Sequence, residues 1–229
     1  MKKLYEKYHH ALPVIIYFIV YMAWFGVIES RKVTRYTVIH MSIDDKIPFC
    51  ELFVIPYFIW FGYVAWIVAY TFFKDKRGYY NVATFLMTGM TIFLIISTFF
   101  PNVQRLRPYV MPRDNVFAHM VRYLYKIDTP TNLWPSIHVY NSLGVYFAVV
   151  HDKRLGGSKF AKNTSLVLTT LIILSTLFLK QHSMFDVLTA FIMAAVVYVL
   201  VYRLDVIVSL RYSYGQRKQR KAQRFGIIK

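Results

Sequence analysis

The chain has 229 residues, of which 57% are hydrophobic and 18% aromatic, and only 17% are charged. A soluble domain carries about 25% charged residues, so the composition excludes an ordinary soluble globular protein. The formal net charge of +17 is typical either of a nucleic-acid-binding domain or of basic loops beside membrane spans. Because apolar runs fill most of the chain, we favour the second interpretation and expect no nucleic-acid partner.

The chain contains one cysteine, Cys50. A lone thiol can form neither an intrachain disulfide nor a cysteine-rich zinc site.

The first apolar run follows Lys2 and Lys3 and resembles the start of a signal peptide. No cleavage site of the small-x-small type follows it, and the run ends instead at residues 25–29. We therefore expect it to be retained as the first membrane span.

Six apolar segments follow one another along the chain, in a sequence without internal repeats. A segment of roughly 20 apolar residues crosses the hydrocarbon core of a membrane, although the fourth segment here is short. We therefore expect an all-α polytopic membrane protein, with six transmembrane helices in one bundle and a basic tail over residues 205–229. The expected spans are 11–29, 52–73, 82–100, 134–150, 164–181 and 185–204.

The basic residues predict the orientation of these spans. Segments on the side of the two termini hold 18 lysines and arginines, and the remaining loops hold 10. Cytoplasmic loops carry the excess of basic residues. We therefore expect both termini in the cytoplasm of a plasma or inner membrane, with loops 30–51, 101–133 and 180–184 facing outward.

One outward loop is nevertheless rich in basic residues. Arginines kept there against the charge bias favour a role in binding an anion; the alternative is a loop that grips lipid headgroups. The five basic residues of this loop are Arg105, Arg107, Arg113, Arg122 and Lys126.

The beginning of the fourth segment has the features of an anion site. Pro135 and Ser136 predict a helix start, with proline in the first turn and serine as the cap. Free N–H groups at a helix start bind anions, and His138 projects from the same turn.

The junction of the last two segments carries a second histidine. If residues 182–186 are helical, His182 and Asp186 lie on one face, and the carboxylate orients the ring and raises its basicity. Asp186 begins an apolar span, where an ionisable group is costly and predicts a function. The alternative is a structural polar contact between helices.

These patches together resemble the type-2 phosphatidic-acid phosphatase superfamily, whose motifs are Lys-x6-Arg-Pro, Pro-Ser-x-His and Ser-Arg-x5-His-x3-Asp. Arg107-Pro108 matches the end of the first motif, and residues 135–138 match the second in full. The third is matched by Ser175, His182 and Asp186. The likeness covers about residues 82–204, and its second and third motifs together are specific.

A weaker likeness points to the inositol-phosphoceramide-synthase branch of this superfamily. It rests on Asp44-x2-Ile47-Pro48-Phe49 and Phe53-x2-Pro56-Tyr57.

Two cations of the superfamily pattern are missing. Phe100 stands where the first motif has lysine, and Thr176 where the third has arginine. Lys180, four residues after Thr176, would lie on the same helical face and supply one charge. Gln104 or Arg105 would fill part of the other gap.

The resemblance implies a mechanism with two histidines and without a metal or another cofactor. His182 would be the nucleophile and form a phosphohistidine, oriented by Asp186. His138 would protonate the leaving alkoxide and then activate the acceptor. Arg107, Ser136 and Lys180 would hold the non-bridging oxygens, where preorganised donors stabilise the growing charge.

The sequence therefore predicts a membrane phosphatase acting on a lipid phosphate, in contact with membrane lipids. One alternative is a phosphotransferase that passes a phospho-headgroup to a lipid alcohol. A second alternative, of another class, is a transporter or structural membrane protein.

Overall fold

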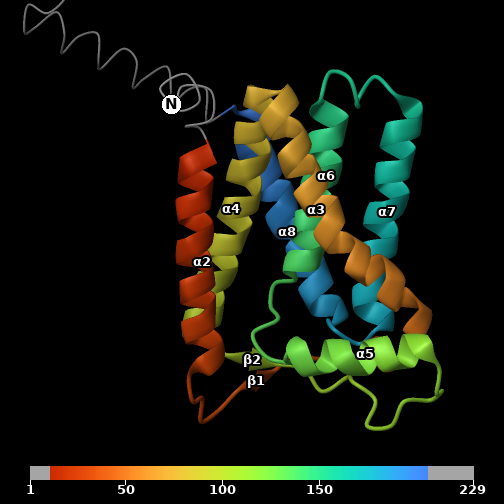
Figure 1. Ribbon diagram of the computed structural model, residues 1–229. Helices are drawn as coiled ribbons and strands as arrows, with labels where there is room; N and C mark the ends of the chain where they lie inside the picture. The colour runs from red at the N-terminus through yellow and green to blue at the C-terminus, as the bar shows by residue number, and fades with distance from the viewer. Residues whose placement is uncertain (1–10, 206–229) are drawn as a thin grey trace, which may run out of the picture.

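A computed structural model describes residues 11–205. Seven α-helices are present in this part of the chain, and the longer ones form a single bundle (Figure 1). The all-α fold expected from the sequence is confirmed. Lys2, Lys3 and, apart from its first residue, the basic tail lie outside the described residues.

Six helices run along the bundle, and a short one lies across its end (Figure 1). The bundle helices are α2 Leu12–Ser30, α3 Val54–Lys74, α4 Lys76–Phe99, α6 Ile137–His151, α7 Lys159–Phe178 and α8 Met184–Tyr198. Helix α8 continues as a π-helix, Val199–Arg203, and a 3-10 turn, Glu51–Phe53, precedes α3. The transverse helix is α5, Val116–Ile127.

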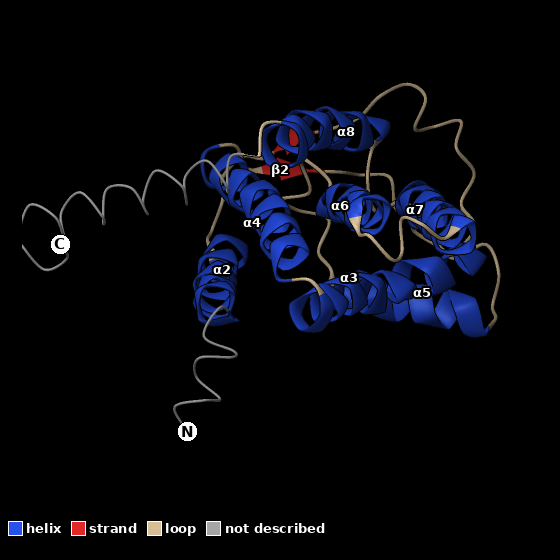
Figure 2. Cartoon of the chain, turned by 90° about the horizontal axis from the view of Figure 1, so that it is seen from above, coloured by secondary structure: helices blue, strands red, loops and turns tan. Residues whose placement is uncertain are grey.

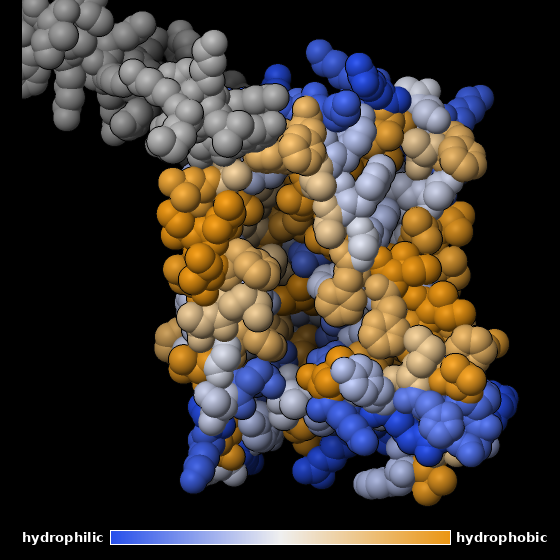
Figure 3. All heavy atoms as spheres, in the orientation of Figure 1, coloured by the Kyte–Doolittle hydropathy of each residue, from blue (hydrophilic) through white to orange (hydrophobic). Residues whose placement is uncertain are grey.

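Five of these helices are long and apolar enough to cross a membrane: α2, α3, α4, α7, and α8 with its π-helical extension. In the view of Figure 3 orange and tan residues cover the middle of the bundle, and hydrophilic residues gather at its lower end and along its upper edge. Exposed apolar surface of this extent needs an apolar partner. These features indicate an integral membrane protein.

Helix boundaries follow caps and not the limits of the apolar runs. Asp75 caps α4 by accepting the N–H of Arg77, so α4 begins six residues before the expected 82. Ser158 caps α7 in the same way, five residues before its expected start at 164. The expected spans begin later than the helices because the first turns of both helices are polar, whereas a cap defines where a helix begins.

Helix α6 has only 15 residues and occupies the centre of the bundle, between α3, α4, α7 and α8 (Figure 2). It approaches α4 closely because Gly89 faces the ring of Tyr140, where an added Cβ would lie 2.1 Å from a ring atom. The Tyr140 ring also stacks on Phe85 of α4, with ring centroids 4.5 Å apart. The centre of the bundle therefore positions the beginning of α6 rigidly.

All three loops expected on the outward side lie at one end of the bundle, the lower end in Figure 1. There β1 (Thr37–Val38) pairs in parallel with β2 (Asn102–Val103) and joins the two long loops. The side chain of Asn102 then accepts the N–H groups of Leu133 and Trp134. These bonds hold the segment that leads into α6.

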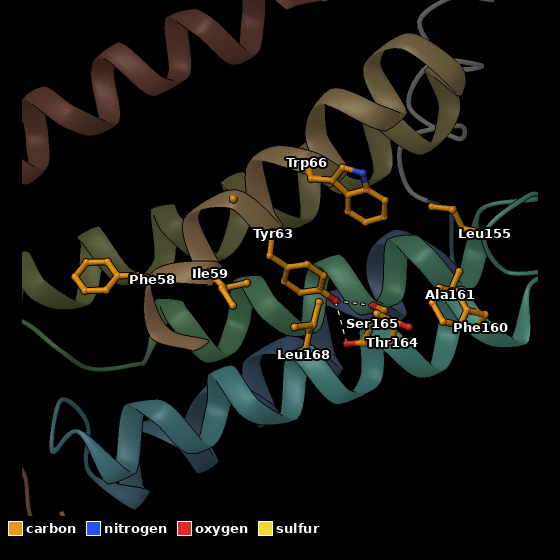
Figure 4. A pocket seen from close by; sticks show the side chains of 11 residues that line it. Phe58, Ile59, Tyr63, Trp66, Leu155, Phe160, Ala161, Thr164, Ser165 and Leu168 are labelled. Atoms are coloured by element: carbon orange, nitrogen blue, oxygen red, sulfur yellow. Dashed lines mark hydrogen bonds between the residues drawn. The ribbon is translucent and has the colours of Figure 1, made fainter. Parts of the chain in front are cut away.

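An apolar groove of about 530 Å³ lies on the side of the bundle, between α3 and α7 (Figure 4). Its polar groups satisfy one another, since the hydroxyl of Tyr63 lies within hydrogen-bond distance of Ser165 and Thr169. Gly62 lines the groove, and an added Cβ there would meet nothing within 4 Å.

Candidate active site

The start of α6 places the first histidine. Ser136 is the N-cap and its hydroxyl accepts the N–H of Val139, which confirms the expected serine cap. Pro135 precedes the cap, so its expected place in the first turn was wrong. The N–H of Ser136 donates to the carbonyl of Asp186 at 3.3 Å, which ties the start of α6 to that of α8. His138 is the second residue of α6 and points toward this junction.

His182 and Asp186 make the expected pair by a different geometry. Ser183 is the N-cap of α8, so His182 precedes the helix and the expected helix over 182–186 was wrong. The Asp186 carboxylate turns back to accept the N–H of Ser183 at 3.0 Å. The same oxygen lies 3.3 Å from His182 Nδ1. A capping box, and not a shared helical face, brings the carboxylate to the ring.

The two histidines face one another, with 3.4 Å between His138 Nδ1 and His182 Nε2. Because Asp186 accepts the proton of His182 Nδ1, the lone pair of His182 is on Nε2, the atom that faces His138. His182 is only 4% exposed and Asp186 is fully buried. Asp186, His182 and His138 therefore form a relay that runs from a buried carboxylate to a partly exposed histidine.

His138 packs against aromatic rings, whereas His182 lies beside a carboxylate. The ring centroids of Tyr57 and Trp60, both on α3, lie 4.7 and 4.4 Å from the centroid of His138. Neither was identified as a site residue from the sequence. This packing fixes the plane of the His138 ring and leaves the surroundings of the site mostly apolar.

Arg107 is the one residue of the basic loop that reaches the site. Its guanidinium donates to the carbonyls of Tyr125 and Asp128, at 3.2 and 2.7 Å, and lies over the Tyr125 ring. It also donates to Gln181 Oε1 at 2.5 Å, beside His182. Burial lowers the pKa of Arg107, an effect that the nearby Asp128 carboxylate opposes. A guanidinium remains protonated at neutral pH despite such a shift.

Lys180 does not lie where the sequence places it. Helix α7 ends at Phe178 and Lys180 has a φ of 54°, so the expected shared helical face with Thr176 is wrong. The Lys180 ammonium donates instead to the backbone carbonyl of Asp44 at 2.6 Å. Burial lowers its pKa. In this structure Lys180 holds the loop before α3.

The two further candidates for phosphate binding have different surroundings. Gln104 uses both ends of its amide within the protein, since Nε2 donates to the Lys180 carbonyl and Oε1 accepts the N–H of Leu106, both at 2.6 Å. Gln104 thus supports the turn before His182. Arg105 is exposed at the surface.

Sequence reasoning missed two buried residues beside His182. Asp44 is 1% exposed and accepts the hydroxyl of Ser183 and the N–H of Met184, at 2.6 and 2.7 Å. It was noted only for the likeness to the synthase branch, and its contact with Ser183 spans 139 positions. Gln181 is fully buried, accepts a hydrogen bond from Arg107 and directly precedes His182 in the chain.

Within residues 11–205, no three His, Cys, Asp or Glu side chains are grouped as ligands for a metal ion. The metal-free reaction expected from the resemblance stays a prediction.

No family model, no curated protein and no solved structure matches the chain. The geometry of the site and the motifs that its residues form are therefore what indicates a function.

Proposed function

We propose that this chain is a membrane phosphatase that hydrolyses a lipid phosphate through a phosphohistidine on His182, within the superfamily that its motifs resemble. The observation that carries the proposal is the relay of Asp186, His182 and His138, in which one carboxylate and one nitrogen face opposite sides of the nucleophile ring. A relay of this kind activates a nucleophile and supplies a proton-transfer partner.

The relay supports a two-step reaction. His182 Nε2 attacks phosphorus, the bond to the leaving oxygen breaks, and His138 gives that oxygen a proton. His138 then takes a proton from water, which attacks the phosphohistidine and releases phosphate and free His182. Asp186 stabilises the positive charge that His182 gains in the first step. Arg107 stabilises the negative charge on the non-bridging oxygens.

The proposed topology has six spans, namely the five long apolar helices and the shorter helix α6. Although α6 is short for a span, the surrounding α3, α4, α7 and α8 cover it. The site lies at the end that the basic residues predict to face outward, and the termini are proposed to lie in the cytoplasm.

The nucleophile is tested with purified protein and a radiolabelled lipid phosphate. We expect the wild-type protein to accumulate a phosphoenzyme that survives base and is lost in acid, as phosphohistidine does. His182→Ala should form none and should lose roughly 10⁴- to 10⁶-fold in kcat, as when one member of a covalent catalytic unit is removed. Rapid quench followed by acid and base treatment measures both.

A phosphoenzyme that still forms in His182→Ala would contradict the assignment of His182 as the nucleophile. Circular dichroism of the variant serves as the control for folding.

The low exposure of the site favours a second candidate, a phosphotransferase. His138 lies between the rings of Tyr57 and Trp60, and His182 is 4% exposed. Such surroundings disfavour water as the acceptor and favour the hydroxyl of a lipid alcohol. Product analysis separates the two: hydrolysis releases inorganic phosphate, whereas transfer gives a new phospholipid that requires added alcohol.

A further inference from the structure

Arg107 has one buried donor without an acceptor. Its Nη atoms donate to three oxygens, those of the Tyr125 and Asp128 carbonyls and of the Gln181 side chain. Its Nε is buried and makes no hydrogen bond within the described part of the chain. An unpaired buried donor destabilises a fold, and this N–H can therefore donate to a molecule that binds at the site.

Gln181 carries a second donor of the same kind. Because a guanidinium has only donors, the oxygen of the Gln181 amide must face Arg107, and the orientation of the amide is thereby fixed. The NH₂ group then points away from Arg107. Gln181 is fully buried, yet its Nε2 has no acceptor among residues 11–205.

The backbone sets Gln181 next to the proposed nucleophile, His182. The N–H groups of Gln181 and His182 donate to the same carbonyl, that of Thr176, at 2.9 and 3.0 Å. This shared acceptor locks the turn that carries the two side chains. Thr176 itself stands where the superfamily pattern has an arginine, and its hydroxyl is bonded to the carbonyl of Ile173. Threonine is uncharged, so Thr176 does not replace the charge of that arginine.

Arg107 and Gln181 each have one unpaired donor, and a hydrogen bond joins the two side chains beside His182. A ligand with several acceptor oxygens would satisfy both donors. We propose that Gln181 Nε2 binds a non-bridging oxygen of the phosphoryl group, with Arg107 as its anchor and as a second donor through Nε. The pair takes over the task of the arginine that is missing at Thr176. The inference rests on the proposed function, because it names the groups that hold the phosphoryl group in that reaction.

Gln181→Glu is the sharpest test, because it has nearly the same shape. The carboxylate still accepts from Arg107, but its second oxygen repels an anion where the amide donated to it. We expect the dissociation constant for vanadate to rise at least about tenfold, the effect of a lost hydrogen bond to a charged group. The thermal stability should be retained, since a charged pair with Arg107 replaces a neutral one.

Tyr123→Glu is the matched control. Tyr123 lies on α5 at the same end of the bundle and is 61% exposed. The added charge is screened by salt, so vanadate binding should stay within about twofold of the wild-type value. If Gln181→Glu does not fold, Gln181→Met preserves the length of the side chain and should weaken vanadate binding in the same direction.

Vanadate binding is measured directly by calorimetry, independently of turnover. Wild-type protein that binds vanadate through Gln181 but turns over no phosphate ester would contradict the proposed function and leave the inference intact. Wild-type affinity in both Gln181 variants would overturn the inference. So would equal losses in Gln181→Glu and Tyr123→Glu.

Discussion

His138 and His182 differ in their neighbours, and the difference assigns their roles. His182 lies beside a carboxylate, which would stabilise the charged intermediate of the proposed reaction, whereas His138 packs against the rings of Tyr57 and Trp60. A histidine without a carboxylate is the weaker nucleophile of the two, because nothing stabilises the imidazolium that attack would create. In the proposed reaction His138 therefore transfers a proton.

His138→Ala tests the role in proton transfer. With an alkyl phosphate the leaving alkoxide needs a proton, so the rate of phosphoenzyme formation should fall by roughly 10²- to 10⁴-fold. An aryl phosphate leaves without that help, so its phosphoenzyme should form and then turn over slowly. Quench-flow with both esters measures the two rates. If His138→Ala slows the first step equally for the two esters, His138 is not the acid.

The predictions from sequence succeeded where the contact is local in the chain. Ser136 caps the helix that follows it, and Asp186 reaches a histidine four residues away. They failed for Lys180, because spacing alone does not reveal that α7 ends and a residue of positive φ follows. Asp44 and Gln181 were missed because their partners are distant in the sequence and only the folded bundle brings them together.

At the scale of the helices, the apolar runs predicted the six helices along the bundle but not the transverse α5, and not how closely the helices approach one another. The six expected segments correspond to the six helices that run along the bundle. Their packing depends on glycines whose importance no pattern of apolar residues marks. Gly89 of α4 is the clearest case, since the Tyr140 ring occupies the space that a side chain would need.

Gly89→Ala should therefore destabilise the bundle by about 1–3 kcal/mol, the usual result of overpacking a filled core. Gly62→Ala is the matched control, because its added methyl group enters the open groove between α3 and α7 and meets nothing within 4 Å. Alanine also favours a helix over glycine, so the control should not lower the midpoint of thermal unfolding. Heating both variants in detergent gives the comparison; equal midpoints would contradict the close approach of α4 and α6.

At the scale of the whole molecule, the two ends of the helix bundle carry different groups of residues. The β1–β2 pair, α5 and the starts of α6 and α8, which carry the relay, lie toward the end where α2 finishes, and α2 begins at the opposite end (Figure 1). Loop 101–136 lies at the end of the relay and supplies Arg107. Two of the segments counted on the cytoplasmic side, 74–77 and 153–162, lie at the other end and hold seven lysines and arginines. A site at the outward end would meet lipids of the outer leaflet.

The orientation of the bundle is tested with a reporter enzyme that is active only outside the cytoplasm. Fused to the C-terminus it should give no signal, because basic segments are retained on the cytoplasmic side. Inserted after Val110, an exposed residue of the loop that carries Arg107, the same reporter should be active. The two fusions control for each other's expression, since each tests one side of the same bundle. An active C-terminal fusion with an inactive loop insertion would invert the topology, and the relay would then act on lipids of the inner leaflet.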